Sequence, residues 1–314
     1  MMNKILKLRH IALIVSVIII AIGMAVGTVC HFVSNGFFNY GAEFASYKSI
    51  QITTSIPEDV SGNKAKKIAE DALSSLGAYE VHFSEGTATA PNTVTYYFPM
   101  SASDDELASA VEDIKAAFEQ QKMEDASAGV LTQTAVPDGG WQLGLAAIAV
   151  SCAAFLQAVY FAFRYKPGMA LSSLCSQATV VGIYAALLAI TRCPVGIQAA
   201  AFAVVAVAVT MICNGVFFSS VKNAFKDESN VKADKYELIA GSAASTAKVN
   251  IAVCVALAVA IVIFGVFALI AAPGAATLSA YLASLIAVVA CAFTFGVFTP
   301  ASYGLLSAID KSNN

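Results

Sequence analysis

Six long apolar runs, separated by polar segments, dominate the sequence. The first covers residues 11–29, and the other five cover about 143–163, 169–190, 197–218, 251–271 and 278–303. A helix of about 20 apolar residues crosses the hydrocarbon core of a bilayer. The pattern therefore predicts six transmembrane helices, with a long polar stretch between the first and the second.

The polar stretch at 36–140 has the periodicities of a folded α+β domain. Residues 47–55 alternate and are β-branched, which predicts a strand. Further strands are expected at 79–85, 92–100 and 129–135. Apolar residues at helical spacing predict helices at 61–76 and about 104–121. The resulting order (strand, helix, strand, strand, helix, strand) is that of a ferredoxin-like domain.

The distribution of charge supports this division. Only 12% of the 314 residues are charged, against about 25% in a usual soluble protein, and the mean hydropathy is +0.72. Of the 21 acidic residues, 16 lie within 43–138, where six lysines leave a formal balance of −10. This composition excludes a wholly soluble protein and a β-barrel, and an acidic domain repels nucleic acid.

Basic residues indicate the orientation. Three of them precede the first run, and most others fall in short loops that a cytoplasmic N-terminus would place inside the cell. We therefore expect a multi-pass membrane protein with its N-terminus in the cytoplasm. The expected parts are a cytoplasmic N-terminus at 1–10, a first transmembrane helix at 11–29, an external domain at 36–140, a five-helix transmembrane domain at 141–306 with a cytoplasmic segment at 219–250, and a cytoplasmic tail at 307–314. The first run also fits a signal peptide, and this alternative stays open.

The apolar runs after residue 141 contain no carboxylate. Their deepest polar groups are the amides of Gln157, Gln177, Gln198, Asn214 and Asn250. Amides do not titrate, but they form hydrogen bonds between helices. The chain also lacks a catalytic triad, a paired carboxylate, a phosphate loop and a metal-ligand spacing, so we expect neither an enzyme nor a cofactor or metal.

The layout of one span, an external ferredoxin-like domain and five further spans resembles SecF, the smaller half of the SecD/SecF family of protein-export accessories. Two short motifs agree. Gly41, Glu43 and Phe44 resemble the family's Gly-x-Asp-Phe motif after the first span, and Tyr160 with Arg164 resembles its Tyr-x-x-x-Arg-Phe segment. The resemblance covers nearly the whole chain and implies half of a resistance-nodulation-type bundle.

A third segment, 242–250, resembles the family's Ser/Thr-rich stretch before the fifth span, where Lys248 and Asn250 match a basic residue and an asparagine. The membrane acids of the family are replaced. Asn214 stands where the fourth span carries an acid, and Gln177 stands where the third span does. An amide keeps the shape of a carboxylate but does not exchange protons.

The resemblance implies an accessory subunit of the Sec translocon that assists protein export. Its implied partners are a SecD-like subunit, the translocon, unfolded preprotein and membrane lipid. Two alternatives remain from different classes: a divergent resistance-nodulation-type transporter half, and a scaffold subunit that has lost proton coupling.

Overall fold

The computed structural model describes residues 9–34, 37–39, 47–54, 59–73, 76, 80–84, 92–99, 102–123, 126–133, 137–227, 233–271 and 275–311. The chain divides into two compact units. The first contains Met1–Asn39, Trp141–Phe267 and Ala280–Asn314, and the second contains Tyr40–Gly140 and Ala268–Ser279.

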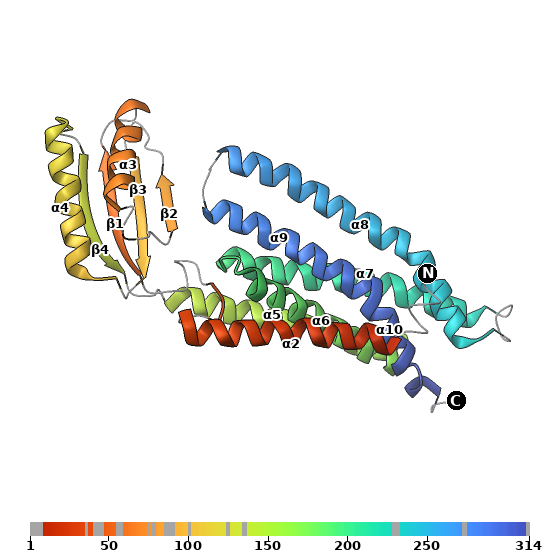
Figure 1. Ribbon diagram of the computed structural model, residues 1–314. Helices are drawn as coiled ribbons and strands as arrows, with labels where there is room; N and C mark the ends of the chain where they lie inside the picture. The colour runs from red at the N-terminus through yellow and green to blue at the C-terminus, as the bar shows by residue number, and fades with distance from the viewer. Residues whose placement is uncertain are drawn as a thin grey trace. The chain divides into compact units, whose positions relative to one another are not determined.

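The first unit is a bundle of helices (Figure 1). Its elements are α2 (Arg9–Ser34), α5 (Pro137–Arg164), α6 (Pro167–Thr191), α7 (Ile197–Lys226), α8 (Lys235–Ala271), α9 (Ala275–Phe293), η2 (Thr294–Phe298), α10 (Thr299–Leu306) and η3 (Ile309–Lys311). Six segments of the described chain are long and apolar enough to cross a membrane: His10–Val33, Gly144–Arg164, Pro167–Thr191, Gln198–Lys226, Lys235–Ile270 and Leu278–Leu306. Together with the domain described below, they confirm the predicted fold class.

Small residues bring α2 against α6. A Cβ built on Gly23 of α2 would lie 2.4 Å from the Cα of Ala186, and one built on Gly182 of α6 would lie 2.9 Å from the Ile20 side chain. In lipid, helices associate through close packing because the solvent gives no hydrophobic drive, and glycine permits the closest approach. The α2–α6 contact therefore depends on these two glycines.

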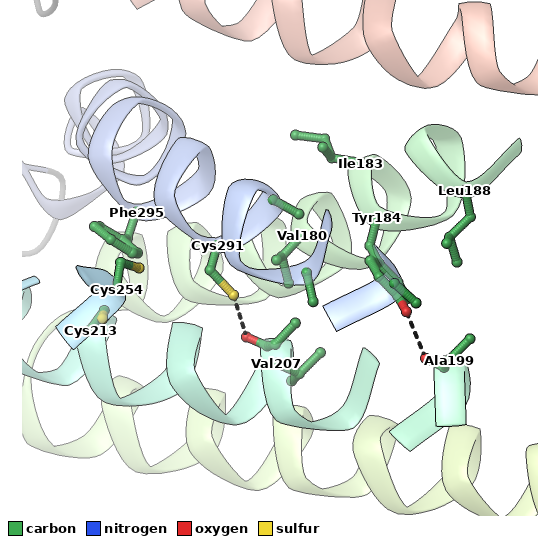
Figure 2. Packing of buried hydrophobic residues seen from close by; sticks show 14 of the residues in the cluster. Val180, Ile183, Tyr184, Leu188, Ala199, Val207, Cys213, Cys254, Cys291 and Phe295 are labelled. Carbon is green, nitrogen blue, oxygen red and sulfur yellow. Dashed lines mark hydrogen bonds between the residues drawn. The ribbon is translucent and has the colours of Figure 1, made fainter. Parts of the chain in front are cut away.

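The core of the bundle lies between α6, α7, α8 and α9 (Figure 2). Tyr184 is buried there, and its hydroxyl donates to the Ala199 carbonyl at 2.9 Å. Cys213, Cys254 and Cys291 pack in the same core, and all seven cysteines of the chain are free thiols. The buried cysteines therefore act as small hydrophobic side chains.

The last span changes its helix type midway. The five residues of η2 form a π-helix, in which the Thr299 N–H donates to the Thr294 carbonyl five residues earlier. Pro300 follows, and a proline has no N–H to continue the ordinary pattern. Single π-turns interrupt helices frequently at functional sites. Here the π-turn sets the position of Thr299, the first residue of α10.

The segment after α2 is hydrogen-bonded to the turn between α6 and α7. Asn39 Nδ2 donates to the Arg192 carbonyl at 3.1 Å, and the Asn39 carbonyl accepts from the Val195 N–H at 2.7 Å. Arg192 ends α6 in a left-handed conformation, with φ 52°, and its Nη1 donates to the Phe37 carbonyl at 3.1 Å. Arg192 thus fixes where the chain leaves the bundle.

Most of the polar segment 219–250 is helical. α7 continues to Lys226 and α8 begins at Lys235. The physical reason is an apolar face: Val221 and Ile239 are completely buried in a second bundle core. The lysines of this segment lower its mean hydropathy, so the apolar face is not apparent from the sequence.

The second unit contains an antiparallel four-stranded sheet and two helices (Figure 1). Its elements are β1 (Tyr47–Thr54), α3 (Asp59–Leu73), β2 (Glu80–Ser84), β3 (Asn92–Pro99), α4 (Asp104–Gln120) and β4 (Ala126–Gln133). The sheet order β2-β3-β1-β4 is that of a ferredoxin-like domain. The sequence predicted all six elements, and the principal difference is an earlier start of β4.

This domain has a core of its own. Ile50 and Ile52 of β1 pair with Tyr96 and Val94 of β3, and these side chains are buried against α3 and α4. Burial, and secondly the charge of Glu70, raise the pKa of Tyr96. Its hydroxyl therefore stays protonated and donates to the Lys66 carbonyl.

Lys48 joins β1 to the start of α4, and we expect Lys48→Met to destabilise the domain by about 1 kcal/mol. Its buried Nζ donates to the Ala102 carbonyl at 2.6 Å and pairs with Asp104 Oδ1 at 2.8 Å. Methionine keeps the apolar stem but loses both bonds. Urea unfolding of this domain in the detergent-solubilised chain, followed by amide hydrogen exchange, measures the loss.

Lys66→Met is the matched control for Lys48→Met. Lys66 contacts Glu70 at 3.7 Å, and both side chains are substantially exposed. Exposed pairs contribute little, so the control should stay within about 0.5 kcal/mol of the wild type. Equal losses in the two variants would contradict the assigned role of Lys48.

Candidate functional site

A run of polar residues on α6 faces the interior of the bundle. Ser172, Ser173, Ser176 and Gln177 are buried, although the helix crosses the membrane region. A polar group in hydrocarbon needs a partner within the protein. These side chains therefore find their partners on α5, α7 and α10, and the resulting set of hydrogen bonds is called the polar network below.

The first part of the polar network consists of amides around Ser173. Ser173 Oγ donates to Gln157 Oε1 of α5 at 3.2 Å, and Gln177 Nε2 donates to the same oxygen. Asn214 Nδ2 of α7 donates to Ser173 Oγ at 3.3 Å. Gln157 Nε2 donates to the Met211 carbonyl at 2.9 Å. Three helices thus meet at one serine hydroxyl.

The second part of the polar network consists of hydroxyls between α6 and α10. Thr299 Oγ1 lies 2.9 Å from Ser176 Oγ and 3.1 Å from Asn214 Oδ1, and it is oriented to donate to either. One hydroxyl carries one proton, so the two bonds are alternatives. The hydroxyls of Ser172 and Ser302 lie 2.7 Å apart and continue the network along α10.

The polar network contains amides and hydroxyls but no ionisable side chain. It can connect four helices and exchange one hydrogen-bond acceptor for another, but its own side chains cannot take up a proton near neutral pH. One acceptor is left over: Gln177 Oε1 is buried and has no hydrogen-bond partner among the described atoms. Leaving a buried acceptor unpaired costs free energy.

The structure brings together two of the predicted site residues and separates the others. Gln177 and Asn214 are linked through Ser173. Lys248 and Asn250 lie on α8, exposed and buried respectively, and the described hydrogen bonds of the polar network do not include them. Gln198 is exposed at the start of α7.

The residues of the family-like motifs lie away from the polar network. Tyr160 is half exposed on α5 and stacks edge-on with Tyr165. Arg164 is exposed at the end of the same helix, where its carbonyl accepts from Lys222 Nζ at 2.9 Å. Gly41, Glu43 and Phe44 lie outside the described residues.

The sequence reasoning missed Ser173 and Thr299, which form most of the bonds between helices. A signal was present for the first. Ser172, Ser173, Ser176 and Gln177 recur at the three- and four-residue spacing that places side chains on one helix face. For Thr299 the signal was weaker, because only the following proline marks a change in the last span.

Thr299→Val should destabilise the bundle by about 1 kcal/mol, because valine keeps the shape but leaves Asn214 Oδ1 without its donor. Thermal unfolding of the purified chain in detergent measures the effect. Thr294→Val is the control, since Thr294 is equally buried in the same span but donates only to Ala290 of its own helix, at 2.8 Å. A control that loses as much stability would show that Thr299 has no special role.

Comparison with known proteins supports the class of fold that this geometry defines. No protein-family model and no curated protein sequence matches the chain significantly. Among solved structures, a crystal structure of SecDF in a super-membrane-facing form matches 99% of this chain with a TM-score of 0.68 and 15% identity. SecDF from Thermus thermophilus, described as a translocon-associated membrane protein, matches 98% with a TM-score of 0.53 and 15% identity.

The fold is therefore that of a SecDF-like membrane protein: six candidate spans and a ferredoxin-like domain after the first of them. The chain spans 39% and 38% of the lengths of these two SecDF chains. This is the structural match that the sequence resemblance to SecF led us to expect.

Proposed function

We propose that this chain is the SecF-like half of a Sec translocon accessory that assists protein export, and that a SecD-like chain supplies the other half. One observation carries the proposal: nearly all of this chain matches SecDF, but it accounts for only 39% of the SecDF chain. Six-helix halves of repeat-built transporters bind against a second half.

The proposed orientation places the N-terminus in the cytoplasm and residues 36–140 outside the cell, in the cytoplasmic membrane. The positive residues support it. Arg164 and Lys226 end their helices, and Lys235 begins one, at the end of the bundle that this orientation makes cytoplasmic. Arg192 is the exception, and hydrogen bonds with Phe37 and Asn39 fix its position.

The proposed mechanism is movement of the ferredoxin-like domain that accompanies rearrangement of the bundle. The polar network supports a rearranging bundle, because Thr299 has two acceptors and Gln177 Oε1 has no partner within the described part of the chain. A proton-driven cycle would need an acid from the partner half, since the side chains of this network do not titrate near neutral pH.

Complementation tests the proposed function. In a bacterial strain that lacks its SecD and SecF proteins, this chain expressed with the SecD-like chain of its own genome should restore export of a secreted reporter. The chain alone should not restore it. Failure of the pair, with both chains present in the membrane, would contradict the proposal.

A second candidate function is a scaffold without proton coupling, which the neutral polar network specifically favours. Collapsing the proton gradient with an uncoupler in the complemented strain separates the two. Rescue that persists without the gradient supports the scaffold, and rescue that is lost supports coupling through the partner.

A small-molecule transporter is less favoured, because such pumps carry larger external domains than the single domain of about 100 residues proposed here.

The sheet edge is the proposed contact for unfolded substrate. β4 is an edge strand, and Val130 and Leu131 are exposed on it. An extended peptide can add to such an edge through backbone hydrogen bonds. A photo-crosslinker at Leu131 should therefore capture an exported chain in transit, whereas one at the exposed Lys67 of α3 should not. Absence of crosslinks at Leu131 would count against this contact.

A further inference from the structure

A groove opens on the bundle surface between the last turns of α5 and α7 and the first third of α8. It has a volume of about 730 Å³. Polar side chains make up much of its wall: Gln157, Tyr160, Ser219, Ser220, Asn223 and Thr246. None of the described lining side chains is a carboxylate. An uncharged, hydroxyl-rich groove at the end of a membrane helix pair can donate several hydrogen bonds to one polar occupant.

A cation lies next to this groove. Lys222 Nζ lies 4.9 Å from the ring centroid of Tyr165, a lining residue, and donates to the Arg164 carbonyl at 2.9 Å. Arg164 and Lys226 are exposed at the ends of the same two helices. Asp227, which ends α7, is the nearest acid along that helix. Positive charge therefore lies beside the hydroxyl donors of the groove.

The walls become apolar away from the charged end. Leu156 lies one turn before Tyr160 on α5 and is 66% exposed, and Ile212 lies one turn before Val216 on α7 and is 65% exposed. Residues four apart share a helix face, so both lie on the continuation of the groove wall toward the middle of the membrane. The surface thus has a polar, cationic end and an apolar continuation.

We propose that this groove binds an anionic phospholipid, with the phosphate near Lys222 and the serine hydroxyls and the acyl chains along α5 and α7. Basic pockets between transmembrane helices recognise anionic headgroups in this way, and the positive charge of Lys222 beside the groove favours an anionic lipid over a zwitterionic one. The site lies in whichever leaflet contains this end of the bundle, so it does not depend on the proposed role in export.

Native mass spectrometry of the detergent-purified full chain tests this proposal. The chain is titrated with dioleoyl phosphatidylglycerol or with dioleoyl phosphatidylcholine. We expect the anionic lipid to be retained about fivefold better, as one cation near an anionic headgroup provides. Lys222→Gln should reduce retention to the level of phosphatidylcholine. Lys67→Gln, which removes an exposed lysine of α3, should leave retention unchanged.

A pair of glycine variants tests the groove independently of charge. A Cβ on Gly215 in the groove, or on Gly144 of α5, would meet no atom within 4 Å. Gly215→Leu should therefore fill the groove and abolish the preference for phosphatidylglycerol, whereas Gly144→Leu should retain it. Equal retention of the two lipids by the wild type, or equal retention by both leucine variants, overturns the proposal. So does a co-purifying protein chain that Gly215→Leu releases while lipid retention stays the same.

Discussion

Gly23→Leu is expected to separate α2 from the bundle and to lower the stability of the membrane unit by about 3 kcal/mol or more. A Cβ at this position would already lie 2.4 Å from both the Cα and the Cβ of Ala186. Backbone atoms cannot move aside as a flexible side chain can, so the two helices must separate. The yield of monodisperse protein in detergent and its thermal unfolding temperature measure the loss.

Gly241→Leu is the matched control for Gly23→Leu. Gly241 is exposed within α8, and a Cβ there would meet no atom within 4 Å. Leucine also has a better helix propensity than glycine, by close to 1 kcal/mol. The control should therefore be as stable as the wild type or more stable. A Gly23→Leu protein with normal yield and unfolding temperature would refute the close packing of α2 on α6.

Asp310→Ala should lower the stability of the bundle by about 3 kcal/mol. Asp310 lies in η3, after the last span, and it is buried. Its Oδ1 accepts from the Gly168 N–H at 2.8 Å, and its Oδ2 accepts from the Tyr303 hydroxyl at 3.1 Å. Alanine leaves both donors unpaired, including an N–H in the first turn of α6. Thermal unfolding of the purified chain measures the loss.

Asp310→Asn separates the hydrogen bonds from the negative charge. The amide oxygen can still accept from the Gly168 N–H, and the Tyr303 hydroxyl can accept from the amide nitrogen. We therefore expect less than half of the loss seen with alanine. Equal losses for asparagine and alanine would show that the charge at the start of α6, rather than the hydrogen bonds, stabilises this contact.

Much of the fold could be predicted because its signals are local. In the ferredoxin-like domain, alternating residues such as Ile50 and Ile52 mark β1, and the observed strand Tyr47–Thr54 differs from the expected range by one residue. The six spans follow from length and hydropathy alone. Both signals depend on neighbours within a few residues, so the sequence contains them directly.

The ends of α7 and α8 could not be predicted because their signal is not local. Lys222, Lys226 and Lys235 mark 219–250 only as a polar segment between two apolar runs. In the structure, Val221 and Ile239 are buried against residues from other helices, and this burial stabilises helical turns on both sides. Hydropathy averaged over a window does not detect one apolar face among lysines.

The candidate site was predicted in part for a similar reason. Gln177 and Asn214 were noticed as amides in apolar runs, and the structure connects them through Ser173. Asn250 was noticed in the same way, and Lys248 was added by resemblance; the described network reaches neither of them. Serine and threonine are common in membrane helices, so a single hydroxyl carries no signal of a site.

The sequence by itself determined the periodicities: six spans, a domain of alternating strands and helices, and apolar runs without carboxylates after residue 141. Only the tertiary structure decided which polar groups meet. Thr299 and Asn214 are 85 residues apart in the chain, and the π-turn before Thr299 helps to bring their side chains within 3.1 Å. Hydrophobic periodicity depends on adjacent residues, whereas a hydrogen bond between helices depends on how those helices pack.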